Sequence, residues 1–505
     1  MFSSLPVTGP IVRENLATHT SIKAAFLFLA LCALYFFSRS PGLDEIDSVN
    51  FAMGVLHFDL WQHQPHPPGY PLFIFLGWLG LRIFGASPEL SLHFVSAVGG
   101  ALFVVAWFLI IRLQFNERLG WWVASCLAIT PGVWMIATKV LTDSLAAGLM
   151  SAEILAAAYF LRNKRAVALF SASILGAAAA GARPQLFLVV LVILITTLRF
   201  HHARMKVWLT SIATLIAGCL VWLLPMWYIQ SRLRPEVAAG VVYPKLVYVM
   251  WAGRLHKPGM YLFAGDWSPK YLGVRFAEHF LGWFGVGFGF IYSWTALAVG
   301  TAVVLAGLAA YLFQIFENKD RQFWKYHSSW AFIHIATIFI SLPSTQRYYL
   351  VIYPLLLVAL LRGFLELPRP WNWSAWTLPA VLLLTAVPIA ITNHRDETPP
   401  LRMVRYLEEL YPPSARGQVI LLLSTRSKRH AEWYAPEFKT INPIPPAAEL
   451  AEITKNAVAV YTDESTAPLP PGWYRIPLVA FRRSPIIYRK AHFMELYFVG
   501  RGNGS

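Results

Sequence analysis

Cysteine is scarce in this chain, with three residues among 505. Cys32, Cys126 and Cys219 all lie in apolar stretches, where a thiol behaves as a small buried hydrophobic group. The sequence therefore predicts no disulfide framework. It also contains no visible internal repeat and no low-complexity tract.

Charged residues are few as well, at 13% of the chain, whereas hydrophobic residues make up 57% and the mean hydropathy is +0.51. Many apolar runs approach or exceed the roughly 18–20 residues that cross the hydrocarbon core of a bilayer. The chain is therefore predicted to be an integral protein of a lipid bilayer. The 20 Trp and 21 Tyr residues fit wide membrane interfaces, where amphipathic rings are stabilised.

The net charge of +16 raises the alternative of a nucleic-acid-binding protein. The cations are spread over many loops rather than gathered in one basic patch with aromatic residues, so we exclude nucleic acid as a partner. Attraction to anionic lipid headgroups and to phosphate-bearing lipid substrates accounts better for the positive charge.

Eleven membrane spans are predicted from the apolar runs. They cover residues 22–37, 91–111, 120–138, 143–161, 166–182, 185–198, 207–229, 284–316, 329–343, 347–362 and 373–391. The first run is short enough for a signal peptide, but no small-residue cleavage site follows it, so we interpret it as a retained span. The stretch 281–316 has room for one tilted helix or two short spans, and the basic residues just after it favour one.

Basic loops alternate with less basic ones, and the positive-inside rule places the basic loops in the cytoplasm. This alternation predicts a cytoplasmic N-terminus at residues 1–21, a transmembrane domain over 22–391 and an external C-terminus. Residues 392–505 are polar and Pro-rich with short β-type runs, which predicts a small external α/β domain.

Two long external loops follow from this topology. The first covers residues 38–90, and the apolar stretch 70–85 within it is predicted to lie as a helix in the membrane interface. The second covers residues 230–280 and contains several prolines. The predicted fold is thus an all-α polytopic membrane domain with a long first external loop, followed by the α/β domain.

The first external loop concentrates polar groups that are otherwise rare before residue 390. It holds Asp44, Glu45, Asp47 and Asp59, with His57, His63, His66 and the turn Pro67-Pro68-Gly69-Tyr70. Polar loops at a membrane edge are natural places for chemistry. The histidines with Asp59 have the residue types of a divalent-metal site, although their spacing matches no tight motif.

Asp44 and Glu45 allow two interpretations. They supply a general base at the membrane surface, or they are acids favoured by the dipole at the start of a helix over 47–56. In the first interpretation Asp47 is the capping residue of that helix and Asp44 is the freer carboxylate.

Polar residues also interrupt or open three later spans. Asp143 opens the span 143–161, Arg183 precedes Pro184 between two spans, and Arg347-Tyr348 opens the span 347–362. The structural explanations are, respectively, a helix N-cap, a snorkelling arginine and an aromatic-belt anchor. The functional explanation is that arginines beside tyrosine hydroxyls hold a phosphate by charge-assisted hydrogen bonds.

Counting the predicted spans from the cytoplasmic N-terminus places these positions on one side of the membrane. Asp44, Asp143, Arg183 and Arg347 all fall at the external face. Because that convergence was not imposed, it predicts one shared functional site.

The order of these motifs resembles the GT-C class of membrane glycosyltransferases, in particular the protein O-mannosyltransferase and aminoarabinose-transferase type. The residues that carry the resemblance are Asp44-Glu45, Pro67-Pro68-Gly69-Tyr70, Asp143, Arg183-Pro184 and Arg347-Tyr348-Tyr349…Pro354, within roughly residues 20–360. It implies transfer of a sugar from a polyprenyl-phosphate donor to a hydroxyl acceptor on a glycan, lipid or protein outside the cytoplasm. The chain lacks the large insertions of the eukaryotic mannosyltransferases, which favours a bacterial inner membrane.

In the implied reaction Asp44 is the general base and single displacement inverts the anomeric carbon. Glu45 and Asp143 are the further catalytic acids. The groups expected to hold the donor phosphate are Arg183, Arg347, Tyr348, His66 and Lys139. The implied reaction requires no cofactor.

Other functions stay open from the sequence. A transporter or flippase of a lipid-linked or anionic substrate also needs many spans with internal acids and arginines. Such proteins usually carry paired broken helices or repeated halves, and neither is visible here. Ligase-type or phosphoethanolamine-type transfer from a lipid is a further alternative.

Overall fold

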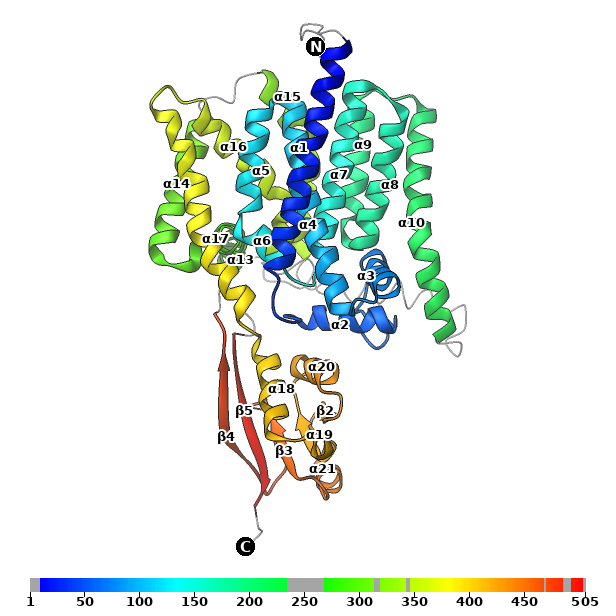
Figure 1. Cartoon of the computed structure of the whole chain (residues 1–505), viewed down its shortest axis with the longest axis vertical. Helices are drawn as coiled ribbons and strands as arrows, with labels where there is room; N and C mark the ends of the chain where they lie inside the picture. Colours follow the sequence, from blue (N-terminus) through cyan, green and yellow to red (C-terminus); the bar gives the residue numbers. More distant parts are fainter. Residues whose placement is uncertain are drawn as a thin grey trace.

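The computed structural model describes residues 10–233, 268–312, 318–341, 346–466, 469–484 and 492–502. A helical bundle is joined to a smaller C-terminal domain that contains a β-sheet (Figure 1). The predicted fold class, a polytopic helical domain with a small α/β domain, is confirmed. Most of the predicted loop 230–280 lies outside the described residues.

The bundle consists of long apolar helices and several shorter segments. The helices are α1 (Pro10–Phe37), α4 (Pro88–Gln114), α5 (Glu117–Ala128), α6 (Pro131–Ala137), α7 (Thr142–Asn163), α8 (Ala166–Ala182), α9 (Phe187–Phe200), α10 (Met205–Leu233), α13 (Pro269–Phe280), α14 (Trp294–Leu312), α15 (Asn318–Ser341), α16 (Tyr353–Leu365) and α17 (Thr377–Arg395). Short helical turns are η1 (Pro184–Leu186), η3 (Leu281–Val286), η4 (Phe290–Tyr292), η5 (Gln346–Ile352) and η6 (Trp371–Trp376).

Within the described residues, seven helices are long and apolar enough to cross a membrane, or eight if the bent pair α5 and α6 forms one span. Each of the eleven predicted spans overlaps a helical segment. However, α8 and the segment Pro184–Phe200 are shorter than the seven, and α15 is not among the seven either, so the number eleven is not confirmed. Of the predicted run 281–316, the described part holds one long helix, α14, preceded by short turns. The protein is an integral, multi-pass membrane protein.

Close backbone contact joins α4 to α7. A Cβ atom at Gly99 of α4 would lie 2.4 Å from the Cα atom of Leu145, and one at Gly148 of α7 would lie 2.5 Å from the Gly99 carbonyl oxygen. Farther along, the fully buried Trp107 donates its indole N–H to Ser151 Oγ at 3.0 Å. These contacts fix the position of α7, which begins beside Asp143.

Replacement of Gly99 by alanine is expected to lower the thermal unfolding midpoint, because the new methyl group must push α4 and α7 apart. Overpacking of this kind costs about 1–3 kcal/mol of stability. The matched control is Gly273→Ala in α13, where a Cβ atom meets nothing within 4 Å. Thermal unfolding of the detergent-purified proteins measures both. Equal midpoints for the Gly99→Ala variant and the wild type would contradict the close packing.

Two helices of the predicted first loop lie at the end of the bundle that faces the C-terminal domain (Figure 1). They are α2 (Ile46–Leu56) and α3 (Pro71–Phe84). One side of α3 is buried against α4, whereas Phe75, Ile83 and Phe84 stay exposed. This apolar exposure fits the predicted helix over 70–85 in the membrane interface. We call this end of the bundle the domain-facing end.

In the part of the chain that the structure describes, the C-terminal domain combines a five-stranded sheet with four helices. Its elements are α18 (Pro399–Leu410), α19 (Pro413–Arg416), β1 (Val419–Leu422), α20 (Thr425–Tyr434), β2 (Lys439–Ile441), α21 (Ala447–Ile453), β3 (Ala459–Thr462), β4 (Trp473–Arg482) and β5 (Phe493–Arg501). The strand order is β2-β1-β3-β5-β4, with β1 parallel to β2 and β3, and β5 antiparallel to β3 and β4. In Figure 1, α18 and α20 lie on the side nearest α2.

Candidate active site

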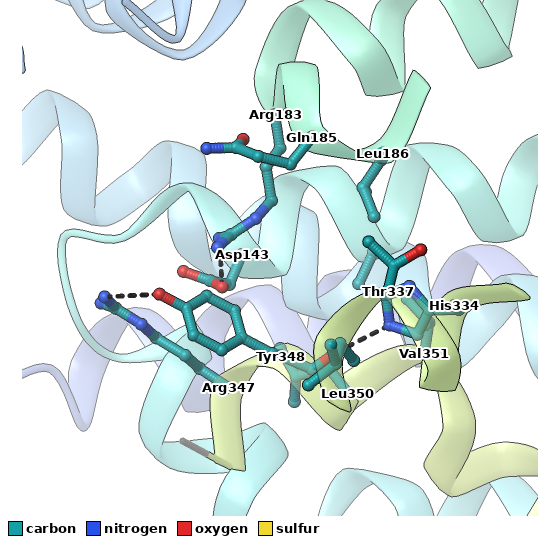
Figure 2. A pocket seen from close by; sticks show the side chains of 12 residues that line it. Asp143, Arg183, Gln185, Leu186, His334, Thr337, Arg347, Tyr348, Leu350 and Val351 are labelled. Atoms are coloured by element: carbon teal, nitrogen blue, oxygen red, sulfur yellow. Dashed lines mark hydrogen bonds and ion pairs between the residues drawn. The ribbon is translucent and has the colours of Figure 1, made fainter. Parts of the chain in front are cut away.

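A pocket at the domain-facing end collects several of the predicted site residues (Figure 2). Its empty volume is about 450 Å³. Its polar lining comes from Asp143, Arg183, Gln185, His334, Thr337, Arg347 and Tyr348. These residues belong to the start of α7, the link between α8 and α9, α15 and η5, so distant parts of the chain build it together.

Helix boundaries place the two arginines at the pocket. Arg183 directly follows α8, and Pro184 begins the short turn η1 before α9, because proline suits the first position of a new helical segment. Arg347 lies in η5, which leads into α16. Both guanidinium groups are thus held at helix junctions rather than on long exposed loops.

Arg183 makes a buried ion pair. Its Nη1 atom donates to Oδ1 of Asp143, and both side chains are less than a tenth exposed. The guanidinium also lies over the ring of Tyr348, with Cζ 4.8 Å from the ring centroid. Removing either charge would leave its partner buried and unpaired, which is strongly destabilising.

Arg347 joins the first loop to the same pocket. It donates to Oε2 of Glu45 at 2.9 Å and to Oδ2 of Asp47 at 3.2 Å. Its Cζ atom lies 5.3 Å from the centroid of the Tyr348 ring, and Nη2 lies 3.4 Å from the Tyr348 hydroxyl. Figure 2 shows both arginines converging on Tyr348. Two cations at one ring, each held by carboxylates, can exchange those carboxylates for an anionic ligand.

The Pro-rich turn reaches the pocket through Tyr70. This residue has φ 48°, a left-handed conformation that is strained for a side chain of its size. Its hydroxyl lies 3.1 Å from Nε2 of His66 and accepts a hydrogen bond from Gln185 at 3.3 Å. On its other side, His66 Nδ1 lies 3.6 Å from Asp47. His66 therefore lies near the arginines and contacts Asp47 and Tyr70.

Asp44 lies in a second cluster. Its carboxylate pairs with Lys139 Nζ at 3.0 Å and with Arg483 Nη1 at 3.1 Å, and all three side chains are almost fully buried. Lys139 belongs to the link between α6 and α7, and Arg483 follows β4 of the C-terminal domain. Asp44 and Lys139 do not line the pocket described above, unlike Asp143, Arg183, Arg347 and Tyr348.

The adjacent acids Asp44 and Glu45 have opposite electrostatic environments. Burial alone would raise the pKa of Asp44, but Lys139 and Arg483 together hold it below its usual range. Burial raises the pKa of Glu45 above its usual range, although Arg347 and Lys139 act against this. Lys139 acts on both carboxyl groups, so the two clusters are electrostatically connected. Neighbouring acids with divergent pKa values are typical of catalytic sites.

Two sequence interpretations of helix ends are wrong. The N-cap of α2 is Glu45 rather than Asp47, and Asp47 instead accepts from Arg347. The N-cap of α7 is Leu141, so Asp143 lies inside the first turn and is free to bind Arg183. In both cases an arginine from a distant segment competes for the carboxylate.

The alternative that the histidines of the first loop and Asp59 form a metal site is not supported by the part of the chain that the structure describes. Those residues hold no group of three or more His, Cys, Asp or Glu side chains arranged around a common point. Asp59 instead accepts the backbone N–H groups of Trp61 and Gln62, at 2.9 and 3.4 Å.

Some residues of the two clusters had no place in the sequence prediction. Gln185 directly follows the Arg183-Pro184 break, so that motif was the available signal for it. His334 donates from Nε2 to the Tyr348 carbonyl oxygen at 2.8 Å and lies in an apolar run without any local signal. Arg483 is far from Asp44 in sequence, and nothing nearby marks it.

Residues 65–229 match the family model of dolichyl-phosphate-mannose-protein mannosyltransferases. No curated protein sequence is similar enough to count as a match. Among solved structures, the fold is similar to ArnT from Cupriavidus metallidurans in the apo state, with a TM-score of 0.52, 12% identity, and 95% of this chain and 98% of that chain covered. It is also similar to the apo oligosaccharyltransferase of Archaeoglobus fulgidus, with a TM-score of 0.52, 12% identity, and coverage of 87% and 69%. The family match thus lies inside the helical bundle, and along most of the chain the fold is similar to these two solved structures.

Proposed function

We propose that the protein transfers a sugar from a polyprenyl-phosphate donor to a hydroxyl acceptor, with inversion, at the external face of a bacterial inner membrane. The observation that carries the proposal is the pair Arg183 and Arg347, which meet at Tyr348 beside a pocket at one end of the bundle. Fixed cations at a membrane edge suit a lipid phosphate, and the neighbouring carboxylates supply candidate bases.

The two arginines suit the phosphate of the donor. In the structure each is held by carboxylates, Arg183 by Asp143 and Arg347 by Glu45 and Asp47. A phosphate entering the pocket would take over part of these contacts. Guanidinium groups bind phosphate by paired charge-assisted hydrogen bonds, and fixed cations stabilise the charge that develops on a leaving phosphate.

The reaction needs one base. The acceptor oxygen bonds to the anomeric carbon while the bond from that carbon to the phosphate oxygen breaks, and the lipid phosphate leaves with the bonding electrons. The acceptor proton passes to a carboxylate, and we assign this role to Asp44. A carboxylate has about four lone-pair sites, so the two ion pairs of Asp44 leave acceptor capacity.

Glu45 is the second candidate for the base. Its carboxyl group touches Arg347, which lines the pocket, and its raised pKa lies closer to neutral pH than that of Asp44. A general base is most effective when its pKa lies near the working pH. Asp143, paired with Arg183, is then suited to orient a hydroxyl of the sugar or acceptor.

A transporter or flippase is the competing function. Within the described residues one pair of helices, α5 and α6, is sharply bent, by 64°. Transporters of the inverted-repeat type use two such broken helices in corresponding halves of the chain. The described residues offer one, which favours the transferase.

The direct test is sugar transfer by the purified protein in lipid nanodiscs, with a panel of polyprenyl-phosphate sugars that includes mannose and aminoarabinose. We expect turnover of at least one donor into a product of inverted configuration, with inhibition by sugar-free polyprenyl phosphate. A folded protein that binds and turns over no donor would refute the transferase, and lipid-linked transport across proteoliposomes would then be measured.

A further inference from the structure

The C-terminal domain forms hydrogen bonds with the residue directly before Asp44. Helix α20 supplies two side chains to the same residue, Leu43. The Leu43 N–H donates to the Tyr434 hydroxyl at 2.8 Å, and the Leu43 carbonyl oxygen lies 2.9 Å from Nε2 of His430. Both backbone groups of Leu43 are thus paired with one helix of another domain. Such pairing fixes the peptide that leads into Asp44.

Two further contacts hold the loop before Asp44 in place. The Tyr434 hydroxyl donates in turn to Oε2 of Glu89, at the start of α4, at 3.1 Å. A Cβ atom at Gly42 would lie 2.7 Å from Leu401 of α18 and 3.0 Å from the Tyr434 hydroxyl, so only glycine fits there without a shift. The loop is therefore enclosed between the bundle and the C-terminal domain.

Arg483, which follows β4, encloses the same loop from the side of the sheet. Its backbone N–H donates to the His492 carbonyl at 2.7 Å, which anchors it between β4 and β5. Its Nη2 atom donates to the Asn393 carbonyl of α17 at 3.4 Å, and its Nη1 atom pairs with Asp44. The side chain is fully buried although it carries a charge. A buried arginine held at three points is a fixed cation.

We propose that the C-terminal domain is part of the catalytic apparatus, and that Arg483 is a positioning residue that holds the Asp44 carboxylate in its reactive orientation. This inference rests on the proposed function, because it assigns the partner of the proposed base. Lys139 approaches Asp44 from the bundle and Arg483 from the C-terminal domain, so the carboxylate is fixed only while the two domains stay docked.

The other titratable groups around Asp44 come from several elements. Besides Lys139 and Arg483, they are Glu89 and His93 of α4, and His430 and Tyr434 of α20. Among these, Arg483 alone combines a permanent charge with direct contact from the C-terminal domain. Its removal takes away one of the two cations that hold the pKa of Asp44 low.

The test compares Arg483→Gln with wild type in full-length protein, using the polyprenyl-phosphate sugar that the wild type turns over fastest. We expect kcat to fall about 10- to 100-fold, as for a misplaced catalytic group. The donor KM should change less than about three-fold, because Arg483 does not line the donor pocket. The acid limb of the pH profile should move to higher pH, since Asp44 then takes up a proton more readily. Arg483→Lys should restore part of kcat.

The matched control is Arg482→Gln, one residue away on β4, where the side chain is exposed and stacks over Phe493. We expect wild-type kinetics from it. Tyr434→Phe is a milder second variant, which removes one hydroxyl from the Leu43 contact and stays informative if Arg483→Gln does not fold. It should speed hydrogen exchange of the 42–45 backbone and lower kcat.

Three results would overturn the inference. They are a wild-type kcat and pH profile in a folded Arg483→Gln protein, an equal loss in Arg482→Gln, or faster exchange in Tyr434→Phe with no change in kcat. Failure of the proposed function looks different, because the wild type itself would then transfer no sugar.

Discussion

The Asp44→Asn protein is expected to transfer sugar about 100- to 10,000-fold more slowly than wild type, the range for loss of a general base. Asparagine keeps the shape of the side chain but cannot take up the acceptor proton. Donor binding should persist, because Asp44 does not line the pocket that holds the arginines. Single-turnover transfer and separate measurement of donor binding give the two quantities.

Glu45→Gln is the matched control, one residue away and also paired with a cation. If Asp44 is the base, Glu45→Gln should retain much more activity than Asp44→Asn. The reverse order would move the base to Glu45. A folded Asp44→Asn protein with full activity would remove Asp44 from the chemistry.

The pH profile of the wild type separates the same two acids independently. Transfer falls once the base becomes protonated, so the acid limb lies at the pKa of the base. The pKa of Asp44 is held below its usual range, which would keep transfer constant into acidic solution. The pKa of Glu45 is raised, which would place the limb above the usual range of a glutamate.

Arg347→Gln should lower the rate of transfer about 100- to 1,000-fold, the range for removal of one group that stabilises developing negative charge. It should also weaken binding of sugar-free polyprenyl phosphate, because the phosphate loses one of two guanidinium partners. The loss includes a second effect, since Glu45 and Asp47 would both lose their cation.

Arg347→Lys separates those two effects, because lysine keeps the charge but not the paired geometry of a guanidinium. The control is Arg82→Gln on α3, an exposed arginine that packs against Trp78 away from the pocket. Undiminished binding of polyprenyl phosphate by Arg347→Gln would show that the phosphate lies elsewhere.

Local hydrophobicity was sufficient to predict the helices of the bundle, because each span is decided by its own apolar run. It was not sufficient to count spans, since α8 and α9 are shorter than a clear crossing. Arg183-Pro184 was readable because proline marks a helix junction whatever surrounds it. The order of spans alone predicted that Asp44, Asp143, Arg183 and Arg347 converge. The structure gathers the last three at one pocket, whereas Asp44 lies in the second cluster.

The remaining features depend on contacts between distant segments. Asp47 has the sequence of a helix cap, and only the approach of Arg347 gives it another partner. The strand β4 was not predicted, because Pro477 weakens the strand pattern and is tolerated here at the edge of the sheet. Helix α20 is mostly polar and lacks a clear apolar stripe, yet it holds Leu43. Neither the sequence around Asp44 nor the sequence around Arg483 indicates that these two residues form an ion pair.

The buried pair of Asp44 and Arg483 also sets an order of events during biosynthesis. Residues emerge from the ribosome from the N-terminus onward, and domains generally fold as units in that order. The first loop is therefore made early, while Arg483 appears only after the whole bundle has been made. Until then Asp44 has Lys139 as its cation but no restraint from the second domain. A partly translated chain in the membrane would thus hold its donor pocket before it gains a fixed base, which would delay transfer until the C-terminal domain has been made.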